Sequence, residues 1–369
     1  MAEQSISTSL QTIDFRKDFM REYVRTNRLA PYSGKGVGNV ICQKMGSGHT
    51  LRHPLVTRLT GAGVSGSSAL RGNGESIGNY SWDTVPTYYR HAVEFNKEDA
   101  EKSNLNLMKE ARPLLMEWAM SETRNRQIQA MASVYDGTTY RNFAAADAGA
   151  WDTTANAWLL ANADRVHFGL STGSYATTSG DFSAGLDTLN TTTDDFVYQC
   201  ADRMRRLAED ADPHIHPYQT NEEGEVYIVF CGSGTFNTLK TSLVTINTSA
   251  DVRGMKITAG GNIIARDGDL FYNGMIFRKV PEITSLFSVS GKPMYNTGAS
   301  GTNNVEPVFL CGTQALVHGM GQAPDIIVDR DYDFGFRPAV AVELKEDIKK
   351  TFFNGVQHGM VSGFFSVPA

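Results

Sequence analysis

The stretch HTLRHPLVTRLTGAGVSGSSALRGNGESIGNYSWDTVPTYYRHAVEF, residues 49–95, decides between two very different folds. Its centre, GAGVSG at 61–66, matches G-x-G-x-x-G, the pattern that holds a pyrophosphate at the start of a helix in dinucleotide-binding enzymes. That role needs a helix directly after the glycines. Here Gly72, Gly74 and Gly78 interrupt the following residues, and glycine is a poor residue for a helix interior. We therefore interpret the match as a coincidence.

The flanks of this glycine-rich centre predict strands. Residues 49–59 and 80–95 are rich in β-branched, aromatic and other apolar side chains, which suit a pleated surface. The sequence thus predicts a long hairpin over 46–95 with its tip at 61–74. An isolated two-stranded ribbon is marginally stable in water. The hairpin is therefore expected to contact a surface outside its own core.

Length and charge limit the class of protein. A chain of 369 residues with 41% hydrophobic residues is expected to form two or more subdomains. Its net charge of −6, from 34 basic and 40 acidic side chains, argues against tight binding of nucleic acid. The N-terminus has no apolar signal segment, and the apolar run VYIVF at 226–230 is too short to cross a bilayer. The sequence therefore predicts a cytosolic protein that does not bind membranes.

The rest of the chain alternates helical and strand-like segments. Residues 96–135 predict the longest helix, in which Pro113 is expected to cause a kink or to begin the second half. Leu115 and Trp118 belong to its apolar stripe and are expected to lie in a packed core. The other members of the stripe are Leu107, Ala111, Ile128, Met131 and Tyr135. Further predictions are a helix within 191–213, a strand at 225–232 covered on both faces, turns at Asp267-Gly268 and Asn273-Gly274, and strands at 339–344 and 359–365.

Few residues of the sequence suggest a metal site or a catalytic site. His214 and His216 alternate on an extended segment near Asp212, but a zinc site needs three or four ligands, and no further cluster lies nearby. Ser233 follows a buried strand in GSGT, where the spacing does not fit a nucleophile elbow, and it is expected to cap the next helix. The cysteines are far apart in sequence and are expected to be buried free thiols; they are Cys42, Cys200, Cys231 and Cys311.

We therefore expect no catalytic, cofactor-binding or metal-binding residues, and no enzyme activity. The alternative is an α/β hydrolase or a metal-dependent enzyme built from His214, His216 or Ser233.

The order of these elements resembles the HK97-type major capsid proteins of tailed bacteriophages. The ending DRDYDFGFRPAVAVELKEDIKKTFFNGVQHGMVSGFF, residues 329–365, looks like the podovirus-like branch of that family. The resemblance implies an α+β capsid fold. Its parts would be an N-terminal arm at 1–45, an extended hairpin loop at 46–95, a peripheral domain with a long spine helix at 96–192, an axial domain at 193–304, and a return to the peripheral domain at 305–369.

The resemblance also implies a function. The chain would be a structural major capsid protein that self-assembles, as hexamers and pentamers, into the icosahedral shell around double-stranded phage DNA. It would be found in the virion after assembly in the bacterial host cytoplasm, with a scaffolding protein and a portal as partners and a decoration protein left open. Contact with packaged DNA would be weak and non-specific, and no cofactor is implied. A non-viral, encapsulin-like compartment shell with the same fold shares the sequence features used above, would differ only in its cargo, and is a further alternative.

The hairpin tip would then overlie a neighbouring subunit, so that its glycines serve shape and not phosphate binding. Arg58 and Arg71, at the edges of the tip, would pair with carboxylates on that neighbour. The implied tip residues are Gly61, Gly63, Gly66, Arg71, Gly72 and Gly74.

Overall fold

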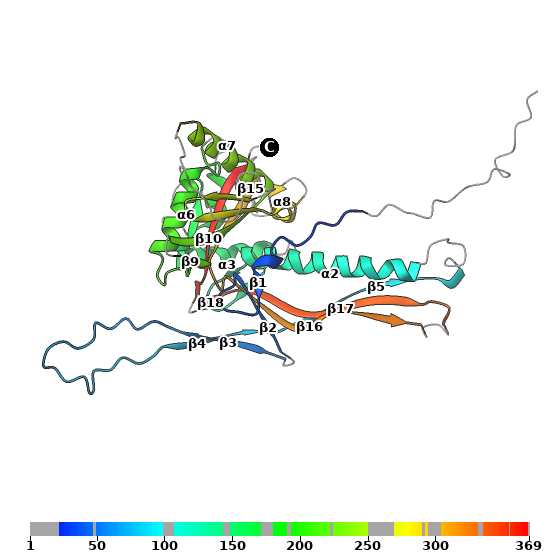
Figure 1. Cartoon of the computed structure of the whole chain (residues 1–369), viewed down its shortest axis with the longest axis horizontal. Helices are drawn as coiled ribbons and strands as arrows, with labels where there is room; N and C mark the ends of the chain where they lie inside the picture. The colour runs from blue at the N-terminus through cyan, green and yellow to red at the C-terminus, as the bar shows by residue number, and fades with distance from the viewer. Residues whose placement is uncertain are drawn as a thin grey trace, which may run out of the picture.

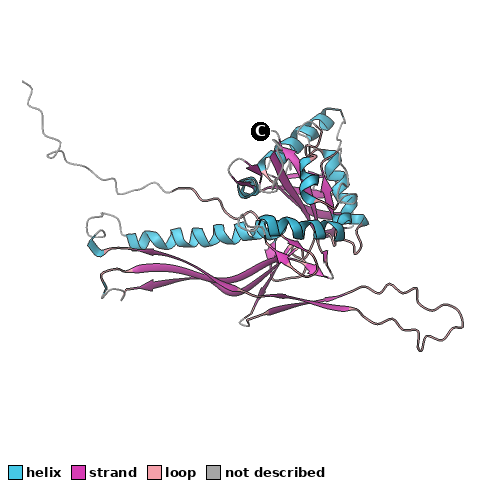
Figure 2. Cartoon of the chain, turned by 180° about the vertical axis from the view of Figure 1, so that it is seen from behind, coloured by secondary structure: helices cyan, strands magenta, loops and turns pink. Residues whose placement is uncertain are grey.

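The structure is a computed structural model organised by two large sheets (Figure 1). It describes residues 22–46, 49–98, 107–142, 148–170, 180–189, 193–221, 224–249, 269–289, 292–293, 304–330, 335–353 and 355–367. The first sheet has five strands and lies beside a long helix, and the second has seven strands with helices around it (Figures 1 and 2). A narrow two-stranded hairpin extends away from both sheets.

The five-stranded sheet carries the longest described helix on one face. In spatial order its strands are β1 (Ser33–Gly34), β2 (Ile41–Met45), β16 (Leu316–Asp329), β17 (Ala339–Lys350) and β5 (Thr87–Glu94). Strand β17 alternates between half-buried and buried residues along its whole length, as expected when one face covers a core. Helix α2 (Leu107–Ala132) packs on that face. The buried residues of this contact are Ala111, Leu115 and Ala119 from α2 and Val340, Val342 and Leu344 from β17.

The seven-stranded sheet is covered on both faces. Its strands are β11 (Asp269–Tyr272), β12 (Met275–Lys279), β10 (Gly224–Cys231), β15 (Asn304–Cys311), β20 (Met360–Val367) and β8 (Val166–Phe168), with β9 (Gln219–Asn221) paired to β10. One face packs against α6 (Tyr198–Asp210) and α7 (Ser233–Ser249). The other packs against α3 (Ala148–Ala161), α5 (Phe182–Asp187) and α8 (Pro281–Phe287).

Strand β10 shows why its apolar run is continuous. Tyr227 and Val229 lie in the core on the α6 and α7 side, whereas Ile228 and Phe230 lie in the core on the opposite side. Successive side chains of a strand point to opposite faces, so a strand between two cores needs apolar residues at every position. The prediction that both faces of this strand are covered is confirmed.

The remaining described elements are short, apart from the hairpin. They are η2 (Ala30–Tyr32), η4 (Ala163–Arg165), β6 (Val134–Tyr135), β7 (Tyr140–Arg141), β13 (Ser288–Val289), β14 (Lys292–Pro293), β18 (Phe352–Phe353) and β19 (Val356–Gln357). The hairpin consists of β3 (Leu51–Val56) and β4 (Asn79–Thr84).

Several local predictions are confirmed. Asn273 and Gly274 have φ angles of 45° and 70° and connect β11 to β12, as a two-residue hairpin turn requires. At Pro113 the expectation that a second half of the helix begins is wrong: helix α2 is continuous through this residue, which lies in its second turn and removes only one hydrogen-bond donor. The expected kink stays a prediction. Cys200, Cys231 and Cys311 are buried free thiols, and Cys42 is half-buried. The turn expected at Asp267-Gly268 lies outside the described residues.

The sheets do not follow the expected domain boundaries. Strand β8 belongs to the segment assigned to the peripheral domain, and β20 was expected to return there, yet both lie in the seven-stranded sheet. Strand β20 pairs with β15 over its whole length and with β8 on its other side. These pairings join residues far apart in the chain, which hydrophobic periodicity does not report.

The second arm of the expected hairpin also divides. Only β4 pairs with β3, and after Val85-Pro86 the chain enters β5, which pairs with β17. Proline has no backbone N–H, which favours the end of a strand at this point. The residues at 80–95 were therefore correctly expected to be strand, but half of them belong to the five-stranded sheet.

Lys350, at the end of β17, is a buried lysine. Its amine donates a hydrogen bond to Gln357 Oε1 at 2.9 Å and lies 5.1 Å from the ring centroid of Trp158. Burial disfavours the charged amine and lowers the pKa of Lys350 from 10.5 to about 7.

Lys350 is therefore expected to make the free energy of unfolding rise with pH between about 7 and 9. In that range the unfolded chain holds a proton on Lys350 that the folded chain lacks, so unfolding takes up a proton. Above about pH 9 the cysteine thiols, whose pKa burial raises, contribute with the opposite sign. Lys350 alone contributes at most about 1.4 kcal/mol per pH unit to the free energy of unfolding. Urea unfolding from pH 7 to 9 should show the rise, and Lys350→Met should flatten it. Lys349→Met, at a half-buried position of the same strand, should keep the parent slope.

Candidate subunit-contact elements

The hairpin is held together over only part of its length. Strands β3 and β4 pair from Leu51 with Thr84 to Val56 with Asn79, and residues 57–78 continue beyond them as turns and extended chain (Figure 2). We name residues 57–78 the extended loop. Several large apolar side chains of the hairpin are exposed. They are Val56, Leu59, Leu70, Ile77 and Tyr80.

Several large apolar side chains exposed on one projecting segment are typical of a contact site. The extended loop therefore has the character of a contact surface.

The glycines of the tip shape the turns of the extended loop. Gly63, Gly66 and Gly72 have φ angles of 71°, 70° and 91°, which residues with a Cβ atom rarely adopt. Gly74 and Arg71 are exposed. No helix follows 61–66, so the geometry for a pyrophosphate site does not form there.

Glu75 closes the neck of the extended loop. Its carboxylate accepts hydrogen bonds from the N–H groups of Thr60 and Gly61 at 2.8 and 2.7 Å, and these donors lower the pKa of Glu75. A Cβ atom at Gly61 would lie 2.7 Å from a Glu75 oxygen, so glycine permits this close approach. Directly beyond the ends of β3 and β4, the N–H of Thr57 donates to the carbonyl of Gly78 at 3.0 Å.

The root of the hairpin is attached to the five-stranded sheet. The N–H of Val85 donates to Asp347 on β17 at 2.8 Å. The Thr84 side chain is fully buried, and a Cβ atom at Gly319 on β16 would lie 2.6 Å from its hydroxyl oxygen. These contacts fix the point at which β4 becomes β5.

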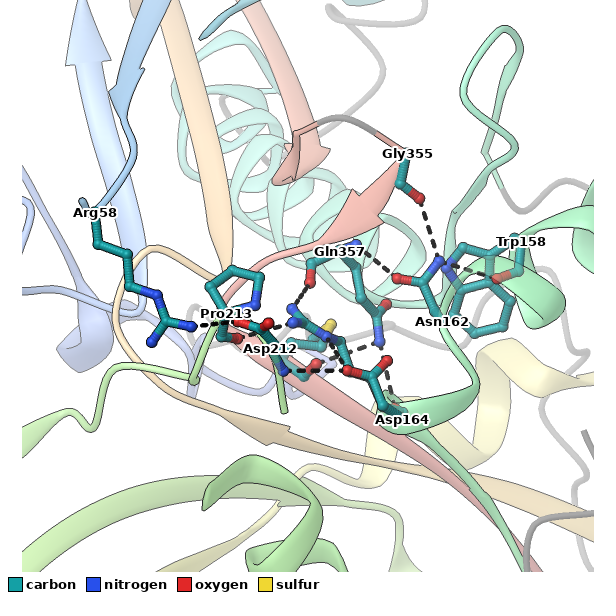
Figure 3. A network of polar contacts seen from close by, with 10 residues as sticks. Arg58, Trp158, Asn162, Asp164, Asp212, Pro213, Gly355 and Gln357 are labelled. Atoms are coloured by element: carbon teal, nitrogen blue, oxygen red, sulfur yellow. Dashed lines mark hydrogen bonds and ion pairs between the residues drawn. The ribbon is translucent and has the colours of Figure 1, made fainter. Parts of the chain in front are cut away.

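From the sequence we expected Arg58 to pair with a carboxylate of a neighbouring subunit, but in the structure it pairs within its own chain. Its guanidinium lies 2.6 Å from the carboxylate of Asp212 in the same chain (Figure 3). Asp212 lies between α6 and β9, so this ion pair joins the extended loop to the part of the chain that holds the seven-stranded sheet. The physical reason is tertiary: Arg58 and Asp212 are far apart in sequence, and only the fold brings them together.

The residues considered for metal binding or catalysis do not form a cluster in the described part of the chain. His214 and His216 are exposed on either side of the buried Ile215. Among the described residues, no group of three histidine, cysteine or carboxylate side chains could hold a metal.

Ser233 does not cap a helix; it lies in the first turn of α7, where its N–H donates to Thr284 Oγ1 at 3.0 Å. Another N–H at this helix start, that of Thr235, donates to the carboxylate of Glu306 on β15 at 2.9 Å.

The two residues predicted for the core of the long helix occupy different positions. Leu115 is 1% exposed against β17, whereas Trp118 is only partly buried and lies beside His91 of β5, with ring centroids 4.8 Å apart.

Leu115→Ala should therefore cost about 2 to 5 kcal/mol of the free energy of unfolding. Trp118→Ala should cost less than the 3 to 5 kcal/mol typical of a fully buried aromatic residue. Chemical denaturation of both variants checks which of them loses more of the free energy of unfolding. A larger loss for Trp118 than for Leu115 would contradict it.

A buried polar cluster, which sequence reasoning missed, joins α2 to the sheet. Glu346 of β17 is 2% exposed and accepts hydrogen bonds from Thr123 at 3.1 Å and Arg126 at 3.2 Å, both on α2. His318 Nε2 of β16 lies 2.9 Å from the same carboxylate. The signal was present: Glu346 occupies a buried position in the strict alternation of 339–350.

In the described part of the chain, no helix is long and apolar enough to span a membrane.

The comparisons with known proteins agree with this architecture. None of the curated proteins matches the chain in sequence. The family model for phage capsid proteins matches residues 4–363. The chain belongs to the phage capsid protein family.

Solved capsid structures have the same fold as this phage capsid protein. The capsid of cyanophage Pam1 is 30% identical with a TM-score of 0.84, and the alignment covers 100% of this chain and 99% of that one. The capsid of Ralstonia phage GP4 is 16% identical with a TM-score of 0.67, covering 100% and 99% of the two chains. The head protein of Helicobacter pylori bacteriophage KHP40 is 14% identical with a TM-score of 0.63, covering 98% and 96%.

These findings confirm the α+β, HK97-like capsid fold and a structural major capsid protein of the virion, which is not an enzyme. Such a subunit assembles with copies of itself into a multimeric shell. The comparisons give no support to the enzyme or compartment-shell alternatives.

Proposed function

We propose that this capsid protein builds the icosahedral head of a tailed phage from hexamers and pentamers, and that the extended loop is its main contact with the next subunit. The observation that supports this role is the loop itself, which extends away from the rest of the chain (Figure 1). It exposes the side chains of Leu59, Leu70 and Ile77. Head-to-tail contacts of one surface with a different surface close into rings, which is the geometry of a capsomer.

The division into domains follows the sheets in this proposal. The five-stranded sheet with α2 would be the peripheral domain, and the seven-stranded sheet with its helices would be the axial domain. Residues 1–45, the N-terminal arm of the sequence prediction, lie only partly within the described residues.

The partners follow from the same proposal. A scaffolding protein would guide assembly in the host cytoplasm, a portal would occupy one vertex, and a decoration protein could bind the outer surface. The net charge of −6 supports weak and non-specific contact with packaged DNA, because tight binding would need many phosphate contacts from Lys and Arg.

Negative-stain electron microscopy of the expressed chain, alone and with the scaffolding protein of its phage, tests the proposal. We expect closed particles of uniform size with icosahedral outlines. Only open sheets, tubes or isolated subunits under both conditions would contradict it.

A further inference from the structure

The extended loop touches the rest of its own chain at a second place, beyond its root. The root is attached to the five-stranded sheet by Val85 and Asp347. Arg58, two residues after β3 ends, reaches Asp212 beside the seven-stranded sheet at 2.6 Å. The hairpin is thus attached on both of its arms, on one to β17 of the five-stranded sheet and on the other to the connection between α6 and β9. Figure 3 shows the second of these attachments.

A buried network fixes the backbone around Asp212. Arg165 of η4 is fully buried, and its guanidinium donates to the carbonyl of Pro213 at 2.8 Å and to the carboxylate of Asp164 at 3.3 Å. The N–H of Asp212 in turn donates to Asp164 at 3.4 Å. The N–H of Asp212 and the carbonyl of the next residue, Pro213, are therefore held by one buried arginine and its partner.

The network continues into the C-terminal part of the chain. Arg165 also donates to the carbonyl of Gln357, whose own N–H donates to Asn162 Oδ1 at 2.7 Å (Figure 3). Burial lowers the pKa of Arg165, and these acceptors compensate the buried guanidinium.

The backbone that carries the Asp212 carboxylate is consequently held in place by these hydrogen bonds. A pair formed with a preorganised group loses less conformational entropy than one between two mobile surface side chains.

We propose that the Arg58–Asp212 pair is a strut that sets the direction of the extended loop for contact with the next subunit. This inference rests on the proposed role of the loop in assembly. With the root alone, the loop has one attachment and can swing about Val85. With the strut, the loop is attached to two separate parts of the chain, and its tip is directed before a neighbour arrives. Arg58 and Asp212 act as positioning residues and contact no second subunit through this pair.

The expected effect of the strut on each loop is modest and depends on salt. Exposed ion pairs shift an equilibrium by about twofold to fivefold, and ions at physiological strength weaken them. A closed particle needs every loop in place, so the loss in assembly rate should exceed the loss for one loop. The global melting temperature should change little, because Arg58 and Asp212 are 54% and 79% exposed.

Charge reversal tests the strut in the full chain. Arg58→Glu and Asp212→Arg are each expected to slow assembly at low salt by at least twofold to fivefold, measured by light scattering and sedimentation. The double variant should recover the parent rate. The matched control is Arg206→Glu, which breaks another exposed ion pair, with Asp210 on α6, and should assemble like the parent. High salt should slow the parent toward the rate of the single variants.

Mixing the two single variants separates a strut within one chain from a bridge between chains. A strut within the chain needs both reversed charges in the same molecule, so the mixture should stay slow. Rapid assembly of the mixture would overturn the proposal and place the pair between subunits. Single variants that match Arg206→Glu, or a double variant that stays slow, would also overturn it.

The outcome is distinguishable from a failure of the proposed function. If the strut variants assemble normally while a chain with a shortened loop does not, the loop keeps its role and only the strut is wrong. If the shortened chain forms normal shells, the role of the loop itself fails.

Discussion

A chain in which an Asn-Gly turn replaces residues 61–74 is expected to fold normally and to form no shells. The replaced segment adds no residue to the three apolar cores of the described chain, so its loss should leave the melting temperature and the circular dichroism spectrum unchanged. The neck contact between Thr57 and Gly78 remains, and an Asn-Gly turn suits a short hairpin. Sedimentation should show small oligomers where the parent, with its scaffold, forms large particles.

A second variant separates the effect of the loop's length from that of its exposed apolar side chains. Replacing Leu59, Leu70 and Ile77 by Ser keeps the length of the extended loop and removes its exposed apolar side chains. If burial of these side chains drives the contact, this variant should also fail to assemble, because each buried large apolar side chain contributes about 1.5 to 3 kcal/mol. Normal shells from both variants would refute the role of the loop. A shortened chain that does not fold would show that the tip belongs to the core.

Glu346→Ala is expected to destabilise the subunit by about 2 to 3 kcal/mol. The substitution leaves the guanidinium of Arg126, which is largely buried, and the side chain of His318 without their shared carboxylate. Arg126 keeps its ion pair with Glu122 at 3.0 Å, so the loss comes from the hydrogen bonds to Glu346 and not from an isolated buried charge. Urea unfolding should show a much lower midpoint with an unchanged slope.

Glu343→Ala is the matched control, because Glu343 lies on the same strand at a half-buried position and binds Gln322 at 2.8 Å. It should lose about 1 kcal/mol or less. Equal losses for the two variants would mean that the cluster around Glu346 carries no special energy. Glu346→Gln should fall between them, since the amide keeps a hydrogen-bond acceptor and loses the charge.

The sequence by itself determined the local elements and the family. The continuous apolar run at 226–230 predicted a strand between two cores, and Tyr227 and Ile228 do lie in opposite cores. The Asn273-Gly274 turn was predictable because a positive φ at both positions leaves few residue choices. The glycines after residue 66 excluded a helix and hence a nucleotide site. Each of these inferences depends on neighbours within a few positions of the chain.

The tertiary structure alone decided which distant segments meet. Strand β20 was predictable as a strand, yet its place between β15 and β8 was not. Arg58 was expected to pair with a carboxylate of a neighbouring subunit, whereas its partner in the structure is Asp212 of the same chain, which no local pattern shows. Strand pairing and ion pairs between distant residues follow from the packing of whole layers, because periodicity reports which face of an element is buried and not what covers it.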